Sequence, residues 1–152
     1  MMLTGKNAIV YGAAGPIGSA VAKAFAAEGA TVHLAGRTQK TLDQVADEIR
    51  AAGGQAETGV VDALDEKSVD EHAAAVGRID ISFNLIGHRQ SNPDTYPEDL
   101  RRALEKDTAA RTMLKRAATL SDVGAVAVFA ASDQARALTG TALNLTVGAV
   151  VN

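Results

Sequence analysis

The chain has 152 residues, of which 47% are hydrophobic and 22% are charged, and its formal net charge is −3. This length suits one domain with a sizeable core, so we expect a single folded domain over residues 1–152. Charges of both signs are scattered along the chain rather than gathered in a basic block, which argues against nucleic-acid binding. There is no cysteine, which excludes disulfides and thiol catalysis, and we predict no metal site.

The start of the chain and its hydropathy bear on location. The opening residues, MMLTGKNAIVYGAAG, lack the long apolar segment of a secretory signal. No run reaches the roughly 18 apolar residues that a membrane span requires. We therefore predict a cytoplasmic protein without a membrane partner.

The first half of the chain alternates between two kinds of segment. Short apolar runs typical of buried strands occupy residues 7–11, 31–35, 56–61 and 79–86. Between them, apolar residues recur at helical spacing, first behind Ile17, then behind Leu42, and finally in a helix around residues 65–76. Strand and helix alternating in units of about 25 residues predict crossover connections and a parallel sheet.

The second half is less regular. Residues 91–97 hold two of the three prolines and predict a loop, and residues 98–120 predict one amphipathic helix or a pair. Residues 123–131 are apolar on all sides, so periodicity alone does not separate a buried helix from a buried strand. Residues 142–147 predict a final strand.

A glycine cluster follows the first strand and opens the first helix. Unpaired amides and the helix dipole favour an anion at such a turn, and glycine leaves space for close backbone approach. The spacing is G-x-x-G-x-x-G rather than the usual G-x-G-x-x-G of dinucleotide-binding turns, and the alternative is an ordinary strand-to-helix turn. The residues expected to contact a dinucleotide here are Gly12, Ala14, Gly15, Pro16, Ile17 and Gly18.

The segment LTGKNAIVYGAAGPIGSAVAKAFAAEGATVHLAGR resembles the opening of short-chain dehydrogenases/reductases, whose turn reads T-G-x-x-x-G-x-G. Gly12 and Gly18 match the outer glycines, Tyr11 replaces the threonine, and Pro16 replaces the middle glycine. Proline suits the first helical position but removes one amide. The resemblance covers residues 3–87 and 114–152. It implies an α/β fold, a three-layer Rossmann-like parallel sheet, and it makes residues 123–131 a helix.

The end of the second strand bears on the choice of cofactor. NAD-binding members of this family usually carry an acidic residue there, whereas this chain reads Leu34-Ala35-Gly36-Arg37. A guanidinium near the ribose favours a 2′-phosphate, so we expect NADP(H) in preference to NAD(H). The alternative is a solvated arginine at a strand end.

The resemblance supplies further cofactor contacts after the third and fourth strands. Asp62, followed by Ala63, resembles the strand-end aspartate that meets the adenine in this family. Asn84-Leu85-Ile86-Gly87 resembles the N-N-A-G segment that lines the nucleotide cleft. We therefore add Asp62, Ala63, Asn84 and Gly87 to the expected cofactor site.

The catalytic motif of the family is missing. Its chemistry rests on a Tyr-x-x-x-Lys pair, in which the lysine lowers the pKa of the tyrosine so that the phenol exchanges a proton with the substrate. The chain has two tyrosines, and the residues four positions after them are Gly15 and Leu100. We therefore assign no catalytic residue. His33, His72 and His88 show no metal-ligand spacing.

The chain is also roughly one hundred residues shorter than is usual for the family. The missing part would carry the catalytic residues and two central strands, leaving the strand at residues 79–86 with an open apolar edge. We expect the final strand, at residues 142–147, to fill that place, giving five parallel strands in the order 3-2-1-4-5. The exposed apolar faces also predict a homo-oligomer.

Three functions follow from these observations. The first is an NADP(H)-binding Rossmann domain without the usual oxidoreductase catalysis. The second is an active NAD(P)(H)-dependent oxidoreductase that uses other groups, such as His88 or Tyr96, on a small carbonyl or alcohol substrate. The third is an interaction protein that keeps the fold and binds no nucleotide. This alternative stays open because Tyr11 and Pro16 replace residues of the family's glycine turn. We favour the first.

Overall fold

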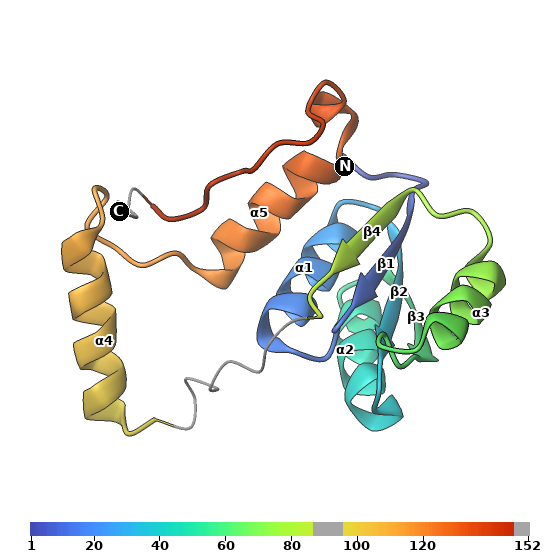
Figure 1. Cartoon of the computed structure of the whole chain (residues 1–152), viewed down its shortest axis with the longest axis horizontal. Coiled ribbons are helices and arrows are strands. Elements are labelled where there is room, and N and C mark those ends of the chain that lie inside the picture. Colours follow the sequence, from blue (N-terminus) through green and yellow to red (C-terminus); the bar gives the residue numbers. More distant parts are fainter. Residues whose placement is uncertain (87–95, 148–152) are drawn as a thin grey trace.

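The computed structural model describes residues 1–86 and 96–147, with strands and helices in alternation along the first half (Figure 1). The strands are β1 (Asn7–Tyr11), β2 (Thr31–Gly36), β3 (Gln55–Val60) and β4 (Ile81–Asn84). The helices are α1 (Pro16–Ala27), α2 (Gln39–Ala51), α3 (Glu66–Val76), α4 (Glu98–Arg111) and α5 (Leu120–Ala131), followed by a 3₁₀ turn, η2 (Asp133–Ala135).

The four strands form one parallel sheet in the order β3-β2-β1-β4. Tyr11 lies opposite Ala35 on β2 and opposite Asn84 on β4, and Ala35 lies opposite Gly59 on β3. The carboxyl ends of the strands therefore meet along one edge. The α/β Rossmann-like parallel sheet expected from the sequence is confirmed.

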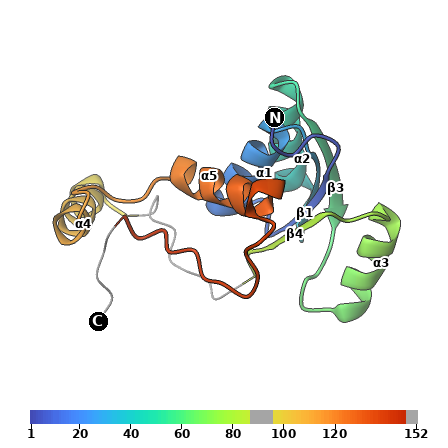
Figure 2. The same ribbon diagram turned by 90° about the horizontal axis from the view of Figure 1, so that it is seen from above.

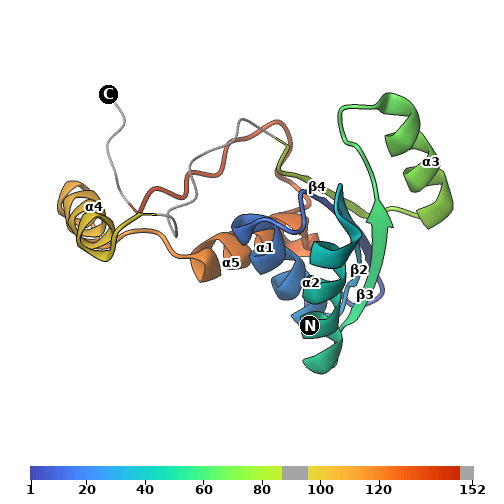
Figure 3. The same cartoon turned by 90° about the horizontal axis from the view of Figure 1, so that it is seen from below.

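The sheet is the middle of three layers. Helices α1, α2 and α5 lie on one face and α3 lies on the other, as the turned views show (Figures 2 and 3). The larger core lies under α1 and α2, where Phe25, Val21 and Leu42 are fully buried against β1 and β2. The smaller core, on the α3 side, contains Ile9, Tyr11, Ala35 and Val61.

Residues 123–131 belong to a helix, as the family resemblance implied. Helix α5 packs along α1, where Gly124 allows a close approach: a Cβ atom on this glycine would lie 3.0 Å from the Cβ of Ala24. A capping box starts the helix, because the hydroxyl of Thr119 accepts the amide of Asp122 and the carboxylate of Asp122 accepts the amide of Thr119. An ion pair to Arg116 and these hydrogen bonds hold the pKa of Asp122 well below its usual range.

The fifth strand expected at residues 142–147 is not formed, and this corrects the predicted strand order. The sheet among the described residues ends at β4, and residues 136–147 run back past α5 toward α4 (Figure 1). The amide of Leu114 donates to the carbonyl of Val147 over 3.2 Å, so this segment meets the chain after α4. Apolar alternation predicts an extended segment but does not show with which strand that segment pairs.

The expected helical region at residues 98–120 contains α4 and the connection to α5. Helix α4 has no buried residue and stands apart from the sheet (Figure 1). The predicted loop at residues 91–97 lies mostly outside the described residues. Within residues 1–86 and 96–147, no helix is long and apolar enough to cross a membrane.

Candidate functional site

A cleft of about 510 Å³ opens at the carboxyl ends of the strands. This edge, where β1 meets its neighbours on either side, is where parallel α/β sheets generally bind ligands. The described lining residues come from the last residues of β1 and β2, from the connections after all four strands and from the start of α2. They are Tyr11, Gly12, Ala14, Gly15, Ala35, Gly36, Arg37, Thr38, Thr41, Val61, Asp62, Ala63, Leu64, Leu85 and Ile86.

The glycine turn forms one wall of this cleft, and two glycines are required by its geometry. Gly12 has φ +79°, and its amide donates to the carbonyl of Ala35 over 3.0 Å, which ties the turn to β2. A Cβ on Gly18 would lie 2.2 Å from the carbonyl oxygen of Gly12 and 2.9 Å from the Cα of Ala13. Gly18 therefore allows α1 to pack closely on the turn, and it does not itself line the cleft.

The first turn of α1 lies beside the cleft, where the sequence predicts an anion site. Gly15 is the N-cap residue and has no capping side chain, so the helix start stays uncovered on the cleft side. Pro16 occupies the first helical position, which removes one donor but keeps the helix geometry. The other amides of the first turn lack partners within the helix, as at every helix start. Amides of this kind can bind a phosphate, but Ile17 and Gly18 are not among the lining residues of the cleft.

Arg37 lies at the end of β2, in the cleft wall, with an exposed side chain. Its guanidinium makes no hydrogen bond or ion pair with any residue of the ranges 1–86 and 96–147. Among the described lining residues it is the one cation, and Asp62 is the one carboxylate. The end of β2 therefore presents a free positive charge to the cleft.

The connection from β3 to α3 forms another part of the cleft wall. One carboxylate oxygen of Asp62 accepts the amide of Leu64 over 3.1 Å, and the amide of Asp62 donates to the hydroxyl of Ser68 over 3.2 Å. At the end of β4, the side-chain oxygen of Asn84 accepts the amide of Ile86 over 2.8 Å. The side chains of Asp62 and Asn84 thus stabilise the turns in which they lie, each by accepting the backbone amide two residues further on.

The structure brings most of the expected cofactor residues together. Those that line the cleft are Gly12, Ala14, Gly15, Arg37, Asp62 and Ala63. Those that do not appear among its lining residues are Pro16, Ile17, Gly18 and Asn84, which lie in or beside the turns that border it. Gly87 and His88 lie outside the described residues.

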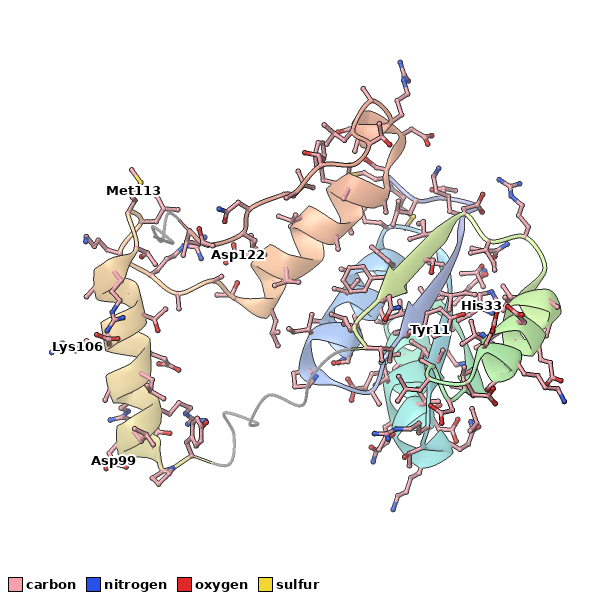
Figure 4. All side chains as sticks on the ribbon, viewed as in Figure 1. Tyr11, His33, Asp99, Lys106, Met113 and Asp122 are labelled. Atoms are coloured by element: carbon pink, nitrogen blue, oxygen red, sulfur yellow. The ribbon has the colours of Figure 1, made fainter. Side chains whose placement is uncertain are left out.

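A group of side chains between α3 and the sheet was not predicted from the sequence. Figure 4 shows Tyr11 and His33 beside α3. The rings of Tyr11 and His72 meet edge to face, with centroids 6.3 Å apart. His33 Nδ1 lies 3.4 Å from the carboxylate of Glu57. Side chains alternate between the two faces of a sheet, so His33 lies on the same face as Tyr11. This alternation would have grouped His33 with Tyr11 once the strand order was known.

Neither tyrosine has the setting of the family's catalytic phenol. Tyr11 is 7% exposed, and burial followed by the charge of Asp70 raises the pKa of its phenol above the usual 10.0. This change is opposite to the one that a neighbouring lysine produces. Tyr96 lies beside α4 and is not among the lining residues of the cleft.

Comparisons with known proteins agree with this geometry. The family model described as short chain dehydrogenase matches residues 6–136. The uncharacterized oxidoreductase YxbG of Bacillus subtilis is 41% identical over 104 residues, which is 64% of this chain and 38% of the relative. The 7alpha-hydroxysteroid dehydrogenase of Clostridium sardiniense is 40% identical over 96 residues, 60% of this chain and 37% of the relative.

Solved structures share the fold. A short chain dehydrogenase from Mycobacterium smegmatis superposes with a TM-score of 0.73 at 20% identity, covering 91% of each chain. The family-model match extends over most of the sequence, and the chain belongs to the short-chain dehydrogenase family. It spans less than two fifths of the length of the two relatives named above.

Proposed function

We propose that residues 1–152 are a single NADP(H)-binding Rossmann domain of short-chain dehydrogenase type that lacks the family's usual oxidoreductase catalysis. The observation that carries this proposal is the cleft, which is lined both by a glycine turn at a helix start and by Arg37. A dinucleotide needs an anion site for its pyrophosphate, and NADP(H) needs a cation for its 2′-phosphate. We further propose a cytoplasmic, homo-oligomeric protein.

The residues present fit the cofactor. A Cβ on Gly15 would meet only the carbonyl of Gly12, at 3.5 Å, so the space beside the helix start is open. Bound NADPH would supply a hydride for a carbonyl substrate, with Gly12, Ala14 and Gly15 at its phosphates and Arg37 at its ribose. Asp62 and Ala63 would meet the adenine. The proposed lack of catalysis rests on the absence of the Tyr-x-x-x-Lys pair.

The choice of cofactor is tested by removing Arg37. In Arg37→Ala, we expect the affinity for NADPH to fall by about tenfold to a hundredfold, because a hydrogen bond to a charged group contributes about 1.5–3 kcal/mol. The affinity for NADH should hardly change, because NADH has no 2′-phosphate. Calorimetric titration of each variant with both nucleotides measures this difference.

Lys40→Ala is the matched control. Lys40 is an exposed cation three residues further on that does not line the cleft, so its removal changes the net charge equally without touching the site. Equal losses in both variants would make the effect a general electrostatic one. Failure of the folded chain to bind either nucleotide would refute the proposed function and favour an interaction protein.

A further inference from the structure

The imidazole of His72 lies in a notch of the sheet that two small residues create. Tyr11, Ala35 and Gly59 face each other in register across β1, β2 and β3. A Cβ on Gly59 would lie 2.6 Å from Nε2 of His72, so the imidazole occupies the space that a side chain on β3 would take. Ala35, between them, is small enough for the rings of His72 and Tyr11 to meet above it.

His72 therefore touches a residue that belongs to the cleft. Tyr11 is almost fully buried and also lines the cleft at the end of β1. The interplanar angle of 70° between the two rings is an edge-to-face packing, which is favourable for aromatic pairs. The position of the Tyr11 ring thus depends on the ring beside it.

His72 also belongs to the side of α3 that packs on the sheet, and α3 follows directly after the cleft wall at residues 61–64. None of the residues of α3 is fully buried, and its apolar contacts with the smaller core come from the partly buried Val69 and Val76. The hydroxyl of Ser68, one turn before His72, accepts the amide of Asp62. A displacement of α3 would therefore move the wall that begins at Asp62.

The surroundings of His72 favour its neutral form. Its Nδ1 is buried without a hydrogen-bond partner among the described residues, and burial, followed by the neighbouring His33, lowers the pKa of His72 below the usual 6.5. His33 and Glu57 face it from β2 and β3, Tyr11 faces it from β1, and Asp70 lies on the same helix. Because the pKa is lower in the folded chain, protonation of His72 disfavours its packed position; this cost is absent above pH 6.5 and grows as the pH falls below it.

We propose that His72 is a positioning residue for the nucleotide cleft: its neutral ring holds α3 and Tyr11 in place, and its protonation loosens the wall at Asp62. This inference rests on the proposed function, and it adds a proton-dependent control of affinity. Nucleotide binding should be tightest above neutral pH and weaken in mild acid.

The test titrates the intact chain with NAD⁺ at about pH 8 and about pH 5.5, on either side of the usual pKa of histidine. NAD⁺ is the probe because it has no 2′-phosphate to titrate over this range and withstands acid. We expect wild-type affinity to fall by about threefold to tenfold at the lower pH, because a single linked proton changes an equilibrium by at most about tenfold per pH unit. In His72→Phe, which keeps a ring and loses the proton, the affinity should be equal at both pH values.

Two further measurements keep the outcomes separate. Gly59→Ala, which fills the notch, should weaken binding at both pH values. Without nucleotide, the protection of α3 amides against hydrogen exchange, relative to the intrinsic exchange rate at each pH, should fall in acid only in the wild type. A wild-type affinity that is equal at both pH values, or an equal fall in His72→Phe, would overturn the inference. Absence of NAD⁺ and NADPH binding at about pH 8 would instead refute the proposed function, and the control of affinity would be refuted with it.

Discussion

Replacing Phe25 with alanine is expected to cost about 3–5 kcal/mol of unfolding free energy, as is typical of a fully buried aromatic residue. Phe25 on α1 has no exposed surface, and its ring packs edge to face on Phe83 of β4, with centroids 6.1 Å apart. The alanine would leave a cavity between α1 and the sheet. Because domains are stable by only about 5–15 kcal/mol, a large fraction of the stability would be lost. Urea unfolding followed by circular dichroism measures the change.

Phe129→Ala is the control for this experiment. Phe129 lies on α5 and is 40% exposed, so its removal should cost clearly less than removal of Phe25. Equal losses in the two variants would contradict the placement of the main core between α1 and the sheet.

Replacing Gly18 with alanine is the second change with a large expected effect. The new Cβ would lie 2.2 Å from a backbone oxygen of Gly12, so α1 and the turn must separate. Overpacking of this kind costs about 3 kcal/mol, against a gain of about 1 kcal/mol from the better helix propensity of alanine. We expect a net loss of about 2 kcal/mol in urea unfolding.

Gly15→Ala separates packing from ligand binding in the same turn. Its Cβ would make only an ordinary contact at 3.5 Å, and its backbone is extended, so the loss of stability should stay below about 1 kcal/mol. The added methyl group would instead occupy the phosphate side of the cleft and reduce NADPH affinity. If Gly18→Ala were as stable as Gly15→Ala, the close contact between Gly18 and Gly12 would be wrong.

The sequence predicted the first half of the fold well because each element there has its own periodic signal. The strand expected at residues 79–86 is shorter than predicted, as β4 covers only Ile81–Asn84, but it lies in the expected place beside β1. The prediction of a final strand was wrong because the apolar alternation at residues 142–147 does not show which strand would pair with this segment. The helix at residues 123–131 could not be settled by periodicity, since α5 is apolar on all sides.

The candidate site was predictable where the motif maps directly onto the turn. Gly12, Gly15 and Arg37 were identified from their places after strands, and they line the cleft. The group around His72 was not predicted, because its residues come from α3 and three different strands. Tyr11 and Gly59 are far apart in the sequence, and only the strand order and register place them side by side on the face of the sheet that His72 contacts.

Binding of NADP⁺ at the cleft is tested most directly by amide chemical shifts of the ¹⁵N-labelled chain. We expect the shift changes to concentrate at the glycine turn, residues 12–18, at Arg37 and Thr38, and at residues 61–64, which border one cleft. Helix α4, which stands apart from the sheet, should be unaffected. Unchanged spectra of the folded protein, or changes confined to α4, would contradict the claim that this cleft is a dinucleotide site.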